Sequence, residues 1–410
     1  MITSFTKQQT CVVLGCVLTY MAAYLNRLNL SAALSNIIVN MQISPTSAGM
    51  LQTCFAAVYA IGQLMNGMIV DRVNPVRYML LGLSGTALCN FLLGVSGQYW
   101  MLLVLCLLNG AFQSMLWTPI VRLIAMHFPD GRMRIRTNFA LSMTLAIGHL
   151  GAWGISGLVS GWVGWRFSFI VPACIAALIL PLVFSLLRSE KRETAAGKAI
   201  AFEKQALGGA LRCFAKTGFL FVLLCCVLYG FAKDGIVTWS PEILRTISPE
   251  LESLTASFSL IIPVINVFGI LFGYYLRSHS HDNNRIVVAL MLPLTALFCL
   301  LPLFFHSLPI TALSLGFACA CLYGMNPMLT NLIPMEYDKM KCVGLAAGVA
   351  DSFIYVGAAL SGVIGGTIYE NGASKGLFWA WILAALVGMV LAWIATLTGF
   401  TNKKNSQNEA

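Results

Sequence analysis

The sequence predicts an all-α membrane protein of twelve transmembrane helices, arranged as two pseudo-symmetric six-helix bundles. Three observations support this prediction: the composition, a series of long apolar runs, and an internal repeat. Of the 410 residues, 58% are hydrophobic and only 10% are charged, and the mean hydropathy is +0.81. A soluble domain usually carries about 25% charged residues. The polar surface is therefore too small to cover a water-soluble core.

The first apolar run, 10–40, carries Arg27 in its middle. It is too long for a cleavable signal peptide, so we expect it to be the first helix of the mature protein. Crossing a bilayer takes roughly 20 apolar residues, and in lipid such a run must be helical because a helix pairs its own backbone groups. The further runs of this length are 78–95, 99–128, 166–187, 217–244, 253–276, 285–305 and 375–399.

Polar side chains recur at helical spacing on two of the expected helices. One stripe contains Gln52, Tyr59, Gln63 and Asn66, and the other contains Asn109, Gln113 and Trp117. Such stripes either line a transport pathway or bond neighbouring helices, and the sequence favours neither role. The frequent small residues of 151–161 and 344–366 favour close approach between helices.

The chain divides near its midpoint, where the one substantial hydrophilic stretch begins Arg-Ser-Glu-Lys-Arg. We expect 1–187 to form an N-terminal bundle, 188–216 a cytoplasmic linker and 217–401 a C-terminal bundle. The polar tail 402–410 is expected to be disordered.

The positive charges predict the orientation. On the expected helix plan, 19 of the 25 Lys and Arg residues fall on one side of the membrane and three on the other. The three on the other side are Arg166, Arg245 and Lys375, and the remaining three, inside expected helices, are Arg27, Arg122 and Lys233. Short loops rich in Lys and Arg stay cytoplasmic. Both termini are therefore predicted to be cytoplasmic, in the inner (plasma) membrane. The net charge of +10 is a topology signal, so no nucleic-acid partner is expected.

The sequence predicts neither an enzyme nor a cofactor. The thirteen cysteines lack paired or metal-like spacing, and most lie in apolar runs, where cysteine behaves as a small hydrophobe. Gly-rich phosphate loops with a lysine and Ser/His/Asp arrangements are missing from the hydrophilic segments. We expect a monomer in the lipid bilayer, with no metal site, no disulfide framework and no ATP-driven pumping.

An internal repeat appears when the sequence is shifted by 206 residues. The coincident pairs are Arg27 with Lys233, Gly67 with Gly273, Gly151 with Gly357, and Ala152 with Ala358. Halves related in this way form pseudo-symmetric transporters with the substrate site between them at the midplane. The repeat therefore predicts that Arg27 and Lys233 face each other across one cavity.

The two cations are the strongest candidates for a substrate site. A cation at mid-bilayer costs at least about 2.5–3.5 kcal/mol, so it must face water, a partner or a substrate. Tyr20, Tyr24 and Ser31 share a helical stripe with Arg27, and Tyr229 and Ser240 share one with Lys233. Two cations flanked by tyrosines suit a small anion.

The alternative is that carboxylates neutralise the two cations, with Asp234 and Asp351 as candidates. Asp234 directly follows Lys233, about 100° around a helix, so we expect it to face away from the cavity. Arg122 lies near a helix end, where it can reach neighbouring carbonyls, which favours a structural role. His149 fits a substrate ligand, a proton carrier or a packing residue equally well.

Four segments resemble those of a known transporter family. They are Gly67-Met-Ile-Val-Asp71-Arg72-Val-Asn74-Pro75, Gly110-Ala-Phe112-Gln113-Ser-Met115-Leu-Trp117-Thr-Pro119-Ile-Val-Arg122, Trp239-Ser240-Pro241 and Gly344-Leu-Ala-Ala-Gly348. Together they resemble the organophosphate:phosphate antiporter family of the major facilitator superfamily, which includes glycerol-phosphate and hexose-phosphate transporters. The first segment alone marks only the superfamily, whereas the second together with Trp-Ser-Pro is much more specific.

The resemblance implies the major facilitator fold and exchange of a phosphorylated metabolite for inorganic phosphate, using one basic residue from each half. Arg27 matches the first of these, Lys233 matches the second with lysine in place of arginine, and Tyr355 matches an aromatic binding position. The candidate substrate-binding residues are Arg27, Lys233, Tyr24, Tyr355, His149, Gln63 and Tyr229. The coupling candidates are Asp351 and Asp234, and the conformational or structural candidates are Gly67, Asp71, Arg72, Arg122, Trp117 and Gln113.

The sequence departs from the family pattern in ways that make the site less positive. Gln63 stands where some members have lysine, and the family's binding histidine aligns with Gly148, one position before His149. Asp234 replaces a tyrosine, and Asp351 adds a further acid.

We therefore expect a small organic anion as substrate, moved by alternating access. Phosphate-linked exchange competes with proton-coupled uptake of a carboxylate, and a transporter-like sensor of a sugar phosphate is a third function to test.

Overall fold

The computed structural model describes residues 5–70, 73–128, 131–188, 214, 217–247, 257–280, 283–337 and 343–408. Within these ranges, 12 helical stretches are long and apolar enough to cross a membrane, as the sequence predicts. The first half contributes α1 (Lys7–Met41), α2 (Pro45–Ile69), α3 (Pro75–Val95), α4 (Tyr99–His127), α5 (Gly131–Val163) and α6 (Phe167–Leu187). The second half contributes α8 (Phe219–Ile247), α10 (Ile261–His279), α11 (Asn284–Phe304), α12 (Leu308–Pro327), η1 (Met328–Leu332), α13 (Ile333–Met335) and α14 (Val343–Asn408).

Short polar residues begin several of these helices where the chain leaves a loop. Thr6 and Gln9 form a capping box at the start of α1. Ser44 and Asn74 cap α2 and α3, and each is followed by a proline in the first helical turn. These side chains satisfy backbone N–H groups that have no partner inside the helix, so the local sequence sets where each span begins.

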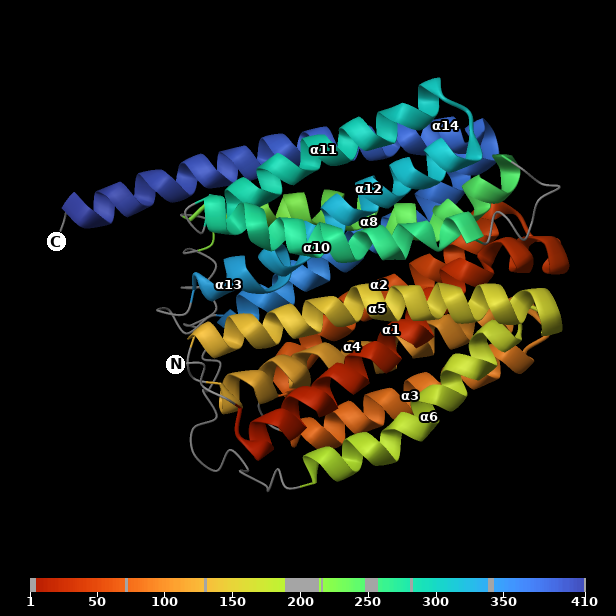
Figure 1. The fold of residues 1–410 in the computed structure, drawn as a ribbon, viewed down its shortest axis with the longest axis horizontal. Helices are drawn as coiled ribbons and strands as arrows, with labels where there is room; N and C mark the ends of the chain where they lie inside the picture. The colour runs from red at the N-terminus through yellow and green to blue at the C-terminus, as the bar shows by residue number, and fades with distance from the viewer. Residues whose placement is uncertain are drawn as a thin grey trace.

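Both chain ends lie at one end of the helix bundle, called here the terminal end (Figure 1). α14 contains the last two spans, Leu345–Asn371 and Ser374–Thr398. Between them the chain reverses direction and returns to the terminal end (Figure 1). The contacts agree, because Glu370 reaches Thr46 at the opposite end, whereas the carbonyl of Ala395 contacts Arg285 at the terminal end.

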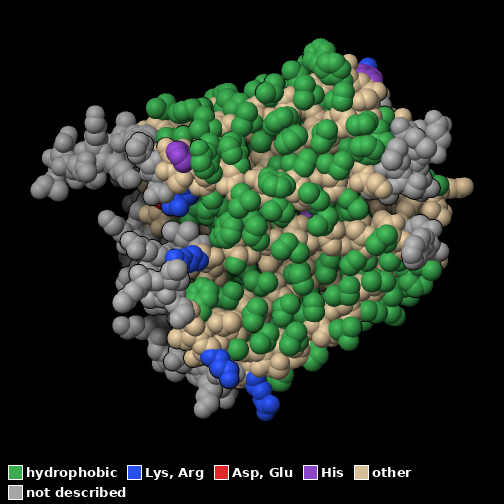
Figure 2. Space-filling view, in the orientation of Figure 1, with side chains coloured by type: hydrophobic (Ala, Val, Ile, Leu, Met, Phe, Trp, Pro, Cys, Tyr) green, Lys and Arg blue, Asp and Glu red, His purple; other side chains and the backbone are tan. Residues whose placement is uncertain are grey.

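Hydrophobic side chains cover the face of the bundle between its two ends (Figure 2). Large hydrophobic side chains are highly exposed in the described residues, such as Leu178 at 76% and Phe304 at 71%. An apolar surface of this extent is stable only against an apolar solvent, which fits a protein embedded in lipid.

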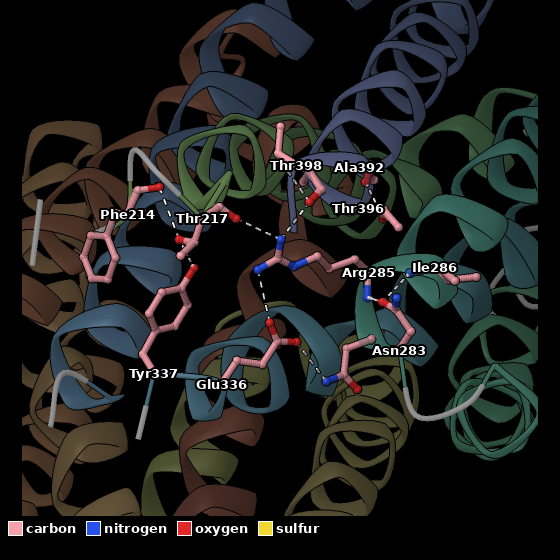
Figure 3. A network of polar contacts seen from close by, with 12 residues as sticks. Phe214, Thr217, Asn283, Arg285, Ile286, Glu336, Tyr337, Ala392, Thr396 and Thr398 are labelled. Atoms are coloured by element: carbon pink, nitrogen blue, oxygen red, sulfur yellow. Dashed lines mark hydrogen bonds and ion pairs between the residues drawn. The ribbon is translucent and has the colours of Figure 1, made fainter. Parts of the chain in front are cut away.

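A buried arginine ties together the terminal end of the second half (Figure 3). Arg285, at the start of α11, donates to the carbonyls of Thr217 and Ala395 and pairs with Glu336 at 3.1 Å. The sequence places Arg285 among the charges outside the membrane, yet it is only 7% exposed. Thr217 just before α8, Glu336 just after α13 and Ala395 of α14 surround its guanidinium, so the arginine is buried although it lies at a helix end.

The polar tail follows the last span. The sequence predicts that 402–410 is disordered, and α14 is described through Asn408. Extending an existing helix costs far less than starting one, so a polar segment can continue the last span. The linker prediction, apart from Arg188 and Phe214, concerns residues outside the described ranges.

Candidate substrate site

A cavity lies where the two halves meet. The first half lines it with Tyr20 and Tyr24 of α1, Tyr59 of α2 and Trp117 of α4, and the second half with Lys233 of α8, Asn326 of α12, Thr330 of η1, and Asp351 and Tyr355 of α14. All are buried except Asn326, which is partly exposed. The first half thus presents aromatic rings, and every charged lining residue comes from the second half.

Arg27 lies behind the aromatic lining. Its guanidinium carbon is 4.7 Å from the ring centre of Tyr59, 5.0 Å from that of Tyr24 and 5.4 Å from that of Tyr355. The Nε atom donates to Oε1 of Gln113 at 2.8 Å, and Nη1 donates to the hydroxyl of Tyr355. Across the described ranges, Arg27 has no carboxylate at ion-pair distance. Neutral oxygens and ring faces therefore hold the cation, and its charge is left available to an anion.

Lys233 and Asp234 form an ion pair, with 3.4 Å between Nζ and Oδ2. The sequence predicts that Asp234 faces away from the cavity, and it is not among the residues that line it, yet its carboxylate still reaches Lys233. The two Cα–Cβ bonds do diverge around the helix, but the four-carbon stem of lysine is long enough to fold back to its neighbour. The Lys233 ammonium also lies 5.6 Å from the ring centre of Tyr229.

Asp351 is a buried acid on the cavity wall, 7% exposed. It lies four residues before Tyr355 on α14, so both side chains share one helix face. Its carboxylate makes no hydrogen bond or ion pair with any other described residue. The ring of Tyr355 stacks on that of Tyr59 with 3.8 Å between centres, which joins the two halves beside this acid.

Two predicted site residues orient the lining from behind it. Tyr229 donates to Oδ1 of Asn326 at 2.9 Å. Gln63 donates to the hydroxyl of Tyr59 at 2.8 Å. The structure therefore places Tyr229 and Gln63 next to lining residues and outside the cavity wall itself.

His149 of α5 lies between the two halves, outside the cavity lining. Its Nδ1 is 3.2 Å from Nδ2 of Asn266 on α10 and 3.1 Å from the hydroxyl of Tyr323 on α12. Trp153 packs edge-on against its ring. These contacts make His149 part of the contact between the halves.

The candidates for a structural role have different surroundings. Trp117 lines the cavity, and Gln113 joins Arg27 to the backbone carbonyl of Asn26. Arg122 donates to the carbonyl of Val70, where α2 ends. A side chain at Gly67 would meet no atom within 4 Å. The remaining two, Asp71 and Arg72, lie outside the described residues.

Sequence reasoning did not identify Asn326 and Thr330. Both lie where α12 passes into the π-helical segment η1, directly around Pro327. A π-helical turn shifts the helical register and occurs often at functional sites. The available signal was an Asn-Pro pair followed by a threonine inside an otherwise apolar run.

Comparison with known proteins identifies relatives across almost the whole chain. The chain is 23% identical to the phosphoglycerate transporter protein of Salmonella typhimurium, over 88% of this chain and 82% of that protein. It is 24% identical to a probable hexose phosphate transport protein of Chlamydia pneumoniae, over 95% of this chain and 91% of that protein. These relatives are organophosphate transporters and not enzymes, as the sequence motifs indicate.

Solved structures show the same fold. A bacterial homologue of the human lysosomal transporter Spinster, in an inward-facing and occupied conformation, matches with a TM-score of 0.71 at 16% identity. The match covers 96% of this chain and 98% of that one. The family model of the Major Facilitator Superfamily matches residues 16–340. With twelve spans among its described residues, in two halves with a cavity between them, this chain belongs to the major facilitator superfamily.

Proposed function

We propose that this protein transports a phosphorylated metabolite in exchange for inorganic phosphate, by alternating access around Arg27 and Lys233. The observation that supports this most is that each half places one buried cation at the same cavity, with Lys233 on its wall and Arg27 behind the aromatic rings that line it. The organophosphate transporters among its relatives agree with such a substrate. The charge distribution in the sequence supports cytoplasmic termini.

The geometry suggests how the anion is held. A phosphate group in the cavity meets the Lys233 ammonium, the Asn326 amide and the Thr330 hydroxyl on one side. Competition from the phosphate weakens the pair between Lys233 and Asp234. On the other side, the Tyr355 hydroxyl donates to the phosphate while it accepts a hydrogen bond from Arg27, so the phosphate interacts with Arg27 through Tyr355. Binding thus links the two halves through their cations.

Neutral variants of the two cations test this site. Arg27→Gln and Lys233→Gln should each weaken binding of phosphate and of hexose or glycerol phosphates, because each removes a charge-assisted contact worth about 1.5–3 kcal/mol. The expected loss is roughly ten- to a hundredfold, measured as the ligand-induced thermal shift of purified protein. Lys375→Gln, at an exposed cation far from the cavity, is the matched control. Unchanged binding in both cavity variants would reject the site.

A second function is supported by Asp351, because an acid without a partner can carry a proton. That function is proton-coupled uptake of a carboxylate.

Proteoliposomes loaded with phosphate, and others left empty, distinguish phosphate exchange from proton-coupled uptake. Exchange predicts fast uptake only into the loaded vesicles. Equal uptake into empty vesicles, driven by an inward proton gradient, would support the symporter. Binding without uptake in either case would indicate a sensor.

A further inference from the structure

The charges around the cavity balance before any substrate enters. Arg27 and Lys233 supply two positive charges, and Asp234 and Asp351 supply two negative charges. Among the described residues, Lys233 and Asp351 are the charged side chains on the cavity wall, while Asp234 pairs with Lys233 and Arg27 contacts the lining ring of Tyr355. A phosphate ester without a cationic group therefore adds net negative charge to a closed site. Such excess charge is costly where water is excluded.

The positive and negative groups on the cavity wall have different partners. Lys233 already has Asp234 at 3.4 Å, and Asn326 and Thr330 beside it offer polar groups to an anion. Asp351 has no partner among the described residues and is 93% buried, since its exposed fraction is 7%. A positive charge placed beside a buried, ionised carboxylate offsets part of the cost of removing it from water.

The rings next to Asp351 suit a cation. Tyr355 lies one turn away on the same face of α14 and stacks on Tyr59, and both rings line the cavity. Tyr20, Tyr24 and Trp117 complete the aromatic part of the wall. Aromatic faces beside a carboxylate are the environment in which proteins hold ammonium groups.

We propose that the substrate carries an ammonium group as well as its acidic group, with the ammonium bound by Asp351 and the surrounding rings. This inference rests on the proposed function, and it narrows the substrate class to amino-substituted phosphate esters or phosphonates. The acidic group binds at Lys233, Asn326 and Thr330. The loaded site then carries less excess charge than it would with a simple phosphate ester.

Two probes of matched length test the inference on the full-length purified protein. Ethanolamine phosphate and ethyl phosphate share a phosphate ester and a two-carbon chain, and only the first has an ammonium group. Binding is measured by thermal shift and by isothermal calorimetry. The wild-type protein should bind ethanolamine phosphate at least about tenfold more tightly, which corresponds to about 1.4 kcal/mol.

Substitution of the acid should abolish this preference. Asp351→Asn should bring the two affinities within about twofold of each other, with ethyl phosphate bound at least as tightly as by wild type. Asp234→Asn is the matched control, since Asp234 already pairs with Lys233. It should change both affinities in the same direction and keep the preference.

Several outcomes would overturn the inference. Equal affinities in the wild-type protein would do so without any variant, as would a preference that persists in Asp351→Asn. The wild-type protein could instead bind hexose phosphates more tightly than ethanolamine phosphate, and Asp351→Asn could remove that preference. This result would show that Asp351 binds sugar hydroxyls. If neither probe binds, or if Arg27→Gln leaves both affinities unchanged, the proposed function itself fails.

Discussion

Arg27 shows how a buried cation can be kept available to a ligand. Its contacts are the amide oxygen of Gln113, the hydroxyl of Tyr355 and the faces of aromatic rings. Each of these stabilises a guanidinium without cancelling its charge. A carboxylate in the same position would form a bidentate pair, and a substrate would then have to displace it.

Gln113→Glu tests this arrangement at one residue. The substitution keeps the shape of the side chain and places a negative charge against Nε of Arg27, 2.8 Å from the present oxygen. Binding of phosphate esters should fall by at least about tenfold, because the new pair competes with the substrate. Gln113→Met removes the hydrogen bonds with Arg27 and Asn26 without adding a charge, and should cost about two- to fivefold. Similar losses in both variants, measured by calorimetry, would show that Gln113 acts through shape and not through charge.

At the scale of helices, the sequence predicted the spans well because bilayer thickness sets their length. The expected runs 99–128 and 285–305 correspond to α4 and α11 within one residue at each end. Partners within a site were harder to predict. The Lys233–Asp234 pair depends on a rotamer of lysine, and Arg285 is buried by helices that are distant in sequence. Hydropathy and spacing contain neither kind of information.

The repeat has a physical basis in helix packing. A Cβ atom at Gly151 would lie 2.8 Å from Leu25 of α1, and one at Gly357 would lie 1.9 Å from the carbonyl oxygen of Val227 of α8. Both glycines thus bring a helix close to the first helix of its own half. This is the close approach that small residues permit in membranes, and it explains why the two positions coincide at the 206-residue shift.

Two glycine variants should therefore change stability in opposite directions. Gly357→Ala forces a methyl group into the backbone of α8 and should destabilise the protein by about 1–3 kcal/mol. At Gly157 of α5, a Cβ atom would meet nothing within 4 Å. Gly157→Ala should stabilise by about 0.5–1 kcal/mol, because alanine loses less backbone freedom in a helix. Thermal unfolding in detergent measures the change in stability of each variant. A melting temperature for Gly357→Ala at or above that of wild type would contradict the packing argument.

At the scale of the whole molecule, the halves meet along α2 and the first span of α14. Thr53 donates to the carbonyl of Ala359 at 2.6 Å, and Ser352 donates to that of Ala60 at 2.9 Å. Nearer the opposite end, Oε2 of Glu370 accepts from the hydroxyl of Thr46 at 2.6 Å and from its backbone N–H at 3.3 Å. An acid of one half therefore caps the N-terminus of a helix in the other half.

This cap should favour the conformation that is closed at the opposite end. Alternating access requires the halves to separate there, so the contacts of Glu370 with Thr46 must break in each cycle. A negatively charged group at a helix N-terminus stabilises it through the backbone N–H groups and the helix dipole. Glu370→Gln weakens this cap without altering the cavity, and should raise the population open at this end relative to the closed one.

Spin labels at Asn40 and His306, one exposed residue in each half near this end, report the separation by pulsed electron resonance in a background without native cysteines. The longer-distance population should grow in Glu370→Gln and stay unchanged in Lys375→Gln, which removes an exposed charge at the same end. Glu370 lies outside the cavity. The intrinsic affinity of the cavity for the substrate, measured on protein held in one conformation, should therefore not change. An unchanged distance distribution in Glu370→Gln would mean that the cap contributes equally to both conformations, and that the helix contacts from Thr53 to Ser352 hold this end closed.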